Sequence, residues 1–220
     1  MKIETTQSVE VQPHALVYGA PKVGKTRLIP TSNNPIVIST DNGLASIRQH
    51  NIPFINCTDW KQCKEAMDWI VTEGCKKYAS IWIDDLTEMA NMKLLEVLPR
   101  VKHGQQAYGE MADEMLARIR AVRQIRGCTV YMICKEERIQ DSDLRLVYAP
   151  VIPGKSANMM LSYLVGQVYR MEHYVDQASG QVYEVLRTKR TPTIEAGDRS
   201  GKLAELELAN ISQIYAKIMS

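Results

Sequence analysis

The sequence predicts an α/β protein with a mostly parallel central sheet flanked by helices and an antiparallel hairpin near the C-terminal end. Short apolar runs of strand length alternate with longer segments of helical periodicity, a pattern typical of parallel sheets. The chain has 220 residues, of which 45% are hydrophobic, and this is enough for one sizeable core. No internal repeat or interdomain linker interrupts it, so we expect a single domain over residues 1–220.

Four apolar runs are the expected core strands, and they cover residues 14–19, 35–40, 79–84 and 129–134. Each is short and rich in β-branched or aromatic side chains, which favour strands. Helical segments separate the last three, because residues 58–74 begin at a capping residue and end at a glycine, and residues 108–127 carry acidic side chains first and arginines last. Strands joined through helices run parallel.

After residue 135 the pattern changes. We expect a long polar connection, followed by two alternating segments within residues 166–190 that flank the turn sequence DQASGQ. These two segments predict an antiparallel hairpin that extends the sheet. Residues 203–219 predict a final amphipathic helix.

Composition argues against several classes of protein. Five cysteines without a CxxC pair argue against a disulfide framework or a zinc site and for reduced thiols. The N-terminal sequence MKIETTQSVEVQP has no apolar core for a signal peptide, and no run approaches the roughly 18 apolar residues that cross a bilayer. We therefore expect a cytoplasmic protein with no membrane partner. The net charge of +2 neither favours nor excludes nucleic acid.

The sequence GAPKVGKT, residues 19–26, fits the pattern G-x-x-x-x-G-K-[ST] and lies between an apolar strand and a segment expected to be helical as far as Pro30. Backbone N–H groups of such a loop surround phosphate oxygens, Lys25 reaches the β and γ phosphates, and the Thr26 hydroxyl binds Mg²⁺. The sequence therefore predicts a site for a nucleoside triphosphate with Mg²⁺. The expected nucleotide-binding residues are Gly19, Ala20, Pro21, Lys22, Val23, Gly24, Lys25, Thr26 and Arg27.

The sequence SIWIDDLTEM supplies a candidate metal ligand and catalytic residue, Asp84, at the end of an apolar strand. In the Walker B arrangement a carboxylate at this place holds the magnesium, usually through water. An aspartate after a strand is also a common helix cap, and the pattern alone leaves that alternative open. Its place on a strand that follows the phosphate loop favours the metal site.

Two classes of phosphate-loop protein differ in where this carboxylate stands. In nucleotide kinases and GTPases the strand next to the phosphate-loop strand commonly carries it, so residues 35–40 would be that strand. In RecA-like and AAA-like ATPases another strand lies between the two, and a separate acidic residue activates water. The double aspartate that follows residues 79–83 fits the second arrangement better.

Five stretches taken together resemble a known group: YGAPKVGKTRL, VISTDNGLASI, SIWIDDLTEM, QQAYGEM and VLRTKRTPTIEAGDRSG. They are similar to the phage-type nucleotide-binding proteins of the RecA-like superfamily, which include the Sak-four single-strand annealing proteins of bacteriophages. The resemblance implies a RecA-like P-loop NTPase fold that binds ATP and hydrolyses it. It also implies single-stranded DNA as a partner, annealing or recombination as the task, and a homo-oligomeric ring or filament with ATP between subunits. A single-strand DNA-binding protein is a further implied partner.

In that family the second strand ends in D-x-E, whose glutamate polarises the attacking water. Here the sequence STD stands at this place, so the resemblance assigns the catalytic role to Asp41. Its side chain is one methylene shorter, which implies weak or water-relayed hydrolysis. Asp85 and Glu88 are rival candidates, and a turn before Gly43 without a catalytic role is the alternative for Asp41.

The resemblance also implies a polar sensor of the γ-phosphate after the fourth core strand, here Lys135 or, with less support, Glu136. The sequence RTKRTPTIEAGDR is similar to the basic motif that RecA-like filaments extend into the neighbouring subunit's nucleotide site. A solvated surface and DNA phosphate binding are alternatives for its cations. The candidates are Arg187, Arg199 and, as the preferred catalytic pair, Lys189 and Arg190.

Two segments correspond to the DNA-binding loops of RecA-like proteins, residues 98–109 and residues 135–159. Both mix cations with aromatic rings, a combination that suits single strands. Neither is strongly basic, and the second also contains four acidic residues. The expected DNA-binding residues are Lys102, His103, Tyr108, Arg138, Arg145 and Lys155.

Two other functions stay open at this point. A small-molecule or nucleotide kinase would need a lid over its second substrate, and the region after residue 135 is the candidate for it. A nucleotide-gated interaction module would bind ATP with little turnover, which the aspartate at position 41 favours.

Overall fold

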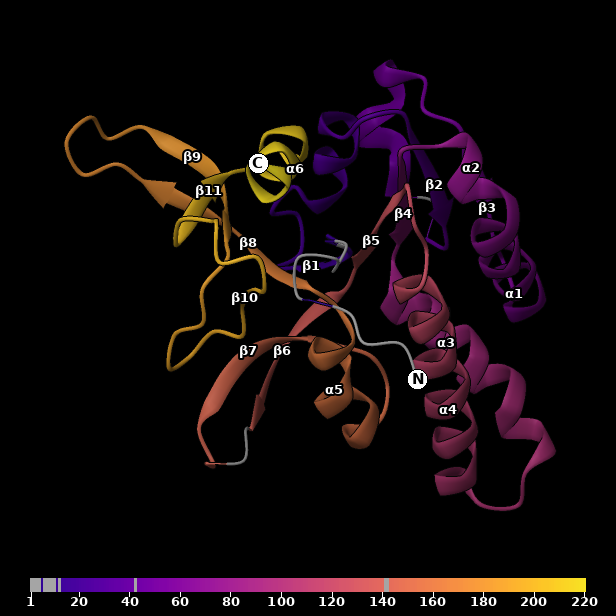
Figure 1. The fold of residues 1–220 in the computed structure, drawn as a ribbon. Coiled ribbons are helices and arrows are strands. Elements are labelled where there is room, and N and C mark those ends of the chain that lie inside the picture. The colour runs from indigo at the N-terminus through magenta and orange to yellow at the C-terminus, as the bar shows by residue number, and fades with distance from the viewer. Residues whose placement is uncertain (1–4, 6–10, 12, 42, 141–142) are drawn as a thin grey trace.

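The structure is a computed structural model that describes residues 5, 11, 13–41, 43–140 and 143–220. Within these residues a nine-stranded sheet has the strand order β11-β9-β8-β1-β5-β4-β2-β3, with β10 paired to β8 (Figure 1). The strands of this sheet are β1 (Ala15–Tyr18), β2 (Pro35–Ser39), β3 (Phe54–Asn56), β4 (Ser80–Asp84), β5 (Thr129–Ile133), β8 (Gln167–Val175), β9 (Val182–Arg187), β10 (Gly197–Asp198) and β11 (Leu206–Leu208).

The central part of the sheet is parallel. β3, β2, β4, β5, β1 and β8 all run in the same direction, whereas β9 and β10 each run antiparallel to β8. β5 lies between β1 and β4, so one strand separates the phosphate-loop strand from the strand that ends at Asp84. The predicted fold class is confirmed, and this strand order is the one expected for RecA-like and AAA-like ATPases.

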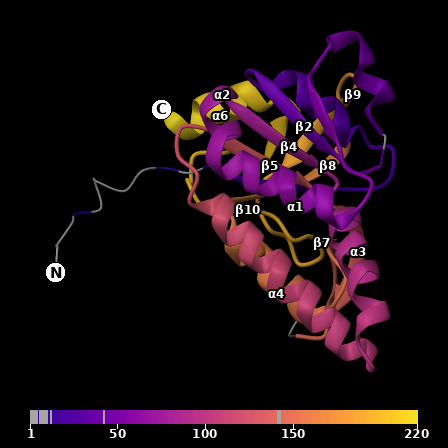
Figure 2. The same cartoon turned by 90° about the vertical axis from the view of Figure 1, so that its right-hand side faces the viewer.

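Helices cover both faces of the sheet (Figures 1 and 2). One face is covered by α1 (Trp60–Trp69), α3 (Leu86–Val97), α4 (Gly104–Arg123) and α5 (Lys155–Leu161). The other is covered by the 3₁₀ helices η2 (Lys25–Thr31) and η3 (Gly43–His50) and by α6 (Ile211–Met219). The remaining helical turns are η4 (Ile70–Gly74), α2 (Cys75–Lys77), η5 (Leu98–Arg100) and η6 (Ser162–Leu164). Among the described residues, no helix is long and apolar enough to cross a membrane.

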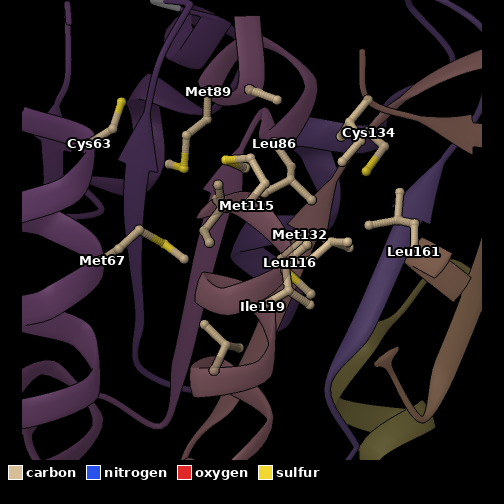
Figure 3. Close-up of a cluster of buried hydrophobic side chains, with 14 of the residues drawn as sticks. Cys63, Met67, Leu86, Met89, Met115, Leu116, Ile119, Met132, Cys134 and Leu161 are labelled. Carbon is tan, nitrogen blue, oxygen red and sulfur yellow. The ribbon is translucent and has the colours of Figure 1, made fainter. Parts of the chain in front are cut away.

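Strand alternation divides the core in two. Along β1, Leu16 and Tyr18 face the helices α1, α3, α4 and α5, and Ala15 and Val17 face η2 and α6. The first cluster is rich in sulfur, with Met67, Met89, Met115 and Cys63 among its side chains (Figure 3). These flexible side chains fill the irregular space between a twisted sheet and three helices.

Two expectations from the sequence are wrong. The polar connection after residue 135 contains an antiparallel pair, β6 (Lys135–Gln140) and β7 (Leu146–Val151), followed by α5. The final helix begins only at Ile211, because residues 206–208 form β11 and pair with β9. The segment after the phosphate loop is helical as expected, and it is a 3₁₀ helix that contains Pro30 and ends at Thr31.

Candidate nucleotide-binding site

The loop of residues 19–24 leaves β1 and turns tightly against β8. Gly19 has a φ of +151°, and a Cβ at this position would lie 2.5 Å from the carbonyl oxygen of Met171. Gly24 has a φ of +107° and is the residue that precedes η2. Both positions need glycine, because an L side chain would be strained at either and would clash with the β8 backbone at the first.

The ammonium group of Lys25 lies inside the curve of this loop. Its Nζ donates to the carbonyl oxygens of Gly19, at 2.7 Å, and Ala20, at 3.1 Å. Burial lowers the pKa of Lys25, and the negative charge of Asp84 opposes that effect. A partly desolvated cation held by two neutral carbonyls would gain much from a phosphate oxygen, because the charged acceptor forms the stronger hydrogen bond.

A hydrogen bond joins the loop to the end of β4. The Thr26 hydroxyl donates to Asp84 Oδ2 at 2.8 Å, and Asp84 is only 4% exposed. Burial raises the pKa of Asp84 to about 6, although the Thr26 hydrogen bond acts in the opposite direction. A buried carboxylate beside a hydroxyl is a donor set that suits Mg²⁺, which binds one or two carboxylates together with substrate phosphates. Within the described residues, no group of three or more His, Cys, Asp or Glu side chains could hold a metal by itself.

Further carboxylates surround Asp84. Asp85 accepts a hydrogen bond from the backbone N–H of Glu88 and caps α3, and burial raises the pKa of Asp85. Asp41 follows β2, which lies beside β4. Burial is the main cause of the raised pKa of Asp84 and of Asp85, and the negative charge of Asp41 raises both pKa values further. The carboxylate of Asp41 accepts from the backbone N–H of Gly43 at 2.8 Å, as in a turn of this kind. Asp41 therefore stands near Asp84 and forms the turn as well.

Thr40 fixes this arrangement, and the sequence analysis missed it. Its backbone N–H donates to the carbonyl oxygen of Asp84 at 2.9 Å, and its hydroxyl oxygen accepts from the backbone N–H of Asp85 at 3.0 Å. The ends of β2 and β4 are thus joined directly beyond their last ladder residues. A threonine one position before an acidic residue at a strand end is the only signal that the sequence offers.

Lys135 follows β5 and closes the site on the side of α3. Its backbone N–H donates to Thr87 Oγ1 at 3.0 Å, and its Nζ lies 3.0 Å from Glu88 Oε2. Glu136 points elsewhere, because its carboxylate pairs with Arg170 at 2.7 Å. We call Asp41, Asp84, Asp85 and Glu88 the acidic cluster. Of the two candidate sensors, only Lys135 contacts it, through Glu88.

The comparisons with known proteins bear on this geometry. A family model described as an AAA domain (AAA_24) matches residues 12–200, well over half of the chain. The chain belongs to this AAA domain family. The match includes the phosphate loop, Asp41, Asp84 and Lys135, and it supports a nucleotide-binding ATPase domain. A search of curated proteins finds no match.

The basic segment of this AAA domain lies on the β7 side of the molecule. Arg187 forms ion pairs with Glu172 and Glu205, so this cation is already engaged within the chain. The residues that follow fold back on β7, where the Tyr148 N–H donates to the Thr193 carbonyl oxygen at 2.9 Å. Lys189, Arg190 and Arg199 are exposed, and Arg190 Nη1 lies 3.6 Å from Glu195 Oε2.

The two predicted DNA segments meet at one end of the molecule. α3 with α4 and β6 with β7 extend to the same side of the sheet, with α5 between them (Figure 1). Tyr108 of α4 approaches the start of α5, since a Cβ at Gly154 would lie 3.6 Å from Tyr108 Cδ1. A cavity of about 570 Å³ lies here, and its lining includes Asn91, Lys135, Glu137, Lys155 and Asn158.

The structure does not bring all six predicted DNA-binding residues into that cavity. Lys155 lines it, whereas Arg138 lies on the opposite face of β6 from Glu137 and stacks over the Tyr148 ring at 5.3 Å. Arg145 lies 3.7 Å from Asp143 in the connection between β6 and β7. Lys102 and His103 are exposed just before α4.

Proposed function

We propose that this AAA domain is a Mg²⁺-dependent ATPase that binds single-stranded DNA and promotes annealing and recombination for a bacteriophage. The observation that carries the ATPase part is the hydrogen bond from Thr26 to Asp84, because it joins the phosphate loop to the acidic end of β4 across the intervening β5. Family membership supports the same conclusion. The annealing role rests on the resemblance of the five sequence motifs.

The proposed chemistry assigns a task to each side chain at the site. Lys25 exchanges its contacts with loop carbonyls for contacts with the β and γ phosphates. Mg²⁺ held by Thr26 and Asp84 would neutralise the charge of the phosphates. Asp41 positions the attacking water. Lys135 leaves Glu88 and contacts the γ-phosphate instead.

The DNA part of the proposal is supported by the position of Lys135. This lysine belongs both to the acidic cluster and to the lining of the cavity between α3, β6 and α5. If ATP binding changes the contacts of Lys135, the lining of the cavity therefore changes as well. Single-stranded DNA would follow the cations of the two segments around it, and the aromatic rings would stack on bases. The residues assigned to DNA are Lys102, His103, Tyr108, Arg138, Arg145 and Lys155.

Fluorescence anisotropy of a labelled single-stranded oligonucleotide tests the proposal. We expect tight, salt-sensitive binding that depends on ATP and Mg²⁺, and weaker binding to duplex of equal length. Lys25→Ala should abolish ATP binding and with it the ATP dependence, whereas Lys61→Ala on the exposed side of α1 should change neither. Absence of DNA binding in every nucleotide state would remove the recombination role. Unchanged ATP affinity in Lys25→Ala would contradict the site itself.

A second function is favoured by one observation. The carboxylate of Asp41 is already bonded to the Gly43 N–H, and it is shorter than a glutamate, so turnover by this residue would be slow. The protein would then act as a nucleotide-gated interaction module. Single-turnover hydrolysis no faster than the uncatalysed rate, with tight ATP binding retained, would select this function. The kinase alternative fits less well, because β5 separates β1 from β4.

A further inference from the structure

The β8–β9 hairpin continues beyond the end of β1, beside the phosphate loop, and projects from the sheet (Figure 1). Tyr18, the last residue of β1, is in register with Arg170, so the later residues of β8 run alongside the loop. Side chains alternate along a strand, and one face of the hairpin is turned to the loop. Met171 shows this, because its Cε would lie 3.0 Å from a Cβ at Gly24.

Four side chains continue this face toward the hairpin tip. Met171, His173 and Val175 share a face on β8, and their cross-strand partners on β9 are Leu186, Glu184 and Val182. Met171 and Leu186 are buried against the loop, whereas Val175 and Val182 are 46% and 58% exposed. We call His173, Val175, Val182 and Glu184 the hairpin face.

An ion pair ties the hairpin face to the nucleotide loop. Glu184 Oε1 lies 2.9 Å from Nη2 of Arg27, the residue that directly follows Thr26. The same carboxylate oxygen would be 3.5 Å from a Cβ at Gly24. The exposed fractions of the two side chains are 60% for Arg27 and 30% for Glu184, so neither is fully covered by the protein.

The residues on the two sides of the phosphate loop differ in chemistry, and this difference sets the orientation of a bound triphosphate. Asp84 ends β4, and Asp41 and Lys135 follow β2 and β5; these three strands all lie on one side of β1. The terminal phosphate and its cation belong on that side. β8 and β9 lie on the other side of β1, where Glu184 of the hairpin face pairs with Arg27.

We propose that the hairpin face and Arg27 bind the nucleoside end of the triphosphate. Glu184 accepts hydrogen bonds from the ribose hydroxyls, which are donors that a carboxylate suits. Arg27 contacts the innermost phosphate and holds Glu184 in place, while Val175 and Val182 pack against the base. The ligand class is a ribonucleoside triphosphate, selected over its 2′-deoxy counterpart. This inference rests on the proposed function, because it assumes that the loop binds the phosphates.

Affinities for ATP, dATP and inorganic tripolyphosphate, each with Mg²⁺, test the inference. We expect the wild type to bind ATP about tenfold more tightly than dATP, since a hydrogen bond to a charged group is lost, and tripolyphosphate more weakly still. Glu184→Ala should bind ATP and dATP alike, and Val182→Ser should weaken the binding of both, while neither variant should bind tripolyphosphate more weakly than the wild type does. Glu205→Ala is the matched control, because Glu205 also pairs with an arginine, Arg187, which is not part of the phosphate loop.

The outcomes separate this inference from the proposed function. Equal affinity of the wild type for ATP and tripolyphosphate would overturn the nucleoside site and leave the phosphate loop standing. An unchanged preference for ATP over dATP in Glu184→Ala would overturn the role of that carboxylate. Failure of the wild type to bind any of the three ligands would overturn the proposed function, and this inference with it. Circular dichroism of each variant establishes that the fold is retained.

Discussion

At the scale of single residues, burial raises the pKa of Asp84 more clearly than that of the other acids at the site. Its pKa is raised to about 6 because the carboxylate lies among buried groups, with one hydroxyl donor in contact. An ionised Asp84 near neutral pH is therefore costly to the fold without a ligand. A cation bound at the loop together with phosphates would offset this cost. Burial of Asp84 therefore lowers the stability of the ligand-free protein and favours binding of the cation.

Replacing Asp84 with asparagine should stabilise the free protein in a pH-dependent way. Because the pKa of this acid is higher in the folded state than its ordinary 3.8, its contribution to stability is present at low pH and lost as the pH rises through about 6. We expect Asp84→Asn to gain on the order of 3 kcal/mol in unfolding free energy at neutral pH and little near pH 4. Urea denaturation across this pH range measures it. An equal difference at both ends of the range would contradict the burial effect, and Glu65→Gln on exposed α1 is the control.

At the scale of elements, the phosphate loop depends on how closely β8 passes behind it. Gly19→Ala should bring a methyl group against the Met171 carbonyl oxygen and strain a φ of +151°. We expect a loss of at least about 1 kcal/mol in stability and a more than tenfold loss of ATP affinity. Calorimetry of ATP binding and thermal unfolding measure the two effects.

The matched control for that change is Gly109→Ala. Gly109 lies within α4, and a Cβ there would have no heavy atom within 4 Å. Alanine should stabilise this helix by up to about 1 kcal/mol and leave ATP binding unchanged. If Gly19→Ala retained both its stability and its ATP affinity, as Gly109→Ala should, the close approach of β8 to the phosphate loop would be contradicted.

Sequence patterns predicted the elements whose burial is uniform. β1, β4 and β5 are buried at every position, so continuous apolar runs marked them. β6 was missed because its sequence KEERIQ is charged, and its place as a strand comes from pairing with β7. The sequence of β11 predicts a helix because leucine and glutamate are good helix formers, and its pairing with β9 overrides that preference.

The residues of the candidate site differ in how well the sequence predicts them. Lys25 and Thr26 were found because a phosphate loop is a local pattern with a mechanism. Thr40 and Glu184 were missed, since they reach the site only through strand pairing between distant segments. Residues brought together by the sheet leave no spacing signal along the chain.

At the scale of the whole molecule, the exposed cations after β9 bear on assembly. Arg190 lines a cavity of about 420 Å³ together with Lys155 and Tyr163, and so belongs with the second DNA segment. Tyr163 is 72% exposed and Met159 is 59% exposed on the same rim. Under the proposed function, this rim of apolar side chains and cations would contact either a neighbouring subunit's nucleotide site or a DNA strand.

Mixing two variants distinguishes these two uses of the basic segment. If Lys189 and Arg190 act on a neighbour's ATP, a Lys189→Ala/Arg190→Ala protein keeps an intact site but supplies no cation, and Lys25→Ala does the reverse. Each should hydrolyse ATP poorly alone, and an equimolar mixture should regain up to about a quarter of the wild-type rate, because that fraction of head-to-tail interfaces pairs an intact site with intact cations. A protein carrying all three substitutions should rescue neither variant. No regain in the mixture, with DNA affinity reduced in the Lys189→Ala/Arg190→Ala protein, would assign these cations to DNA phosphates, since such contacts act within one subunit and weaken binding irrespective of the neighbour.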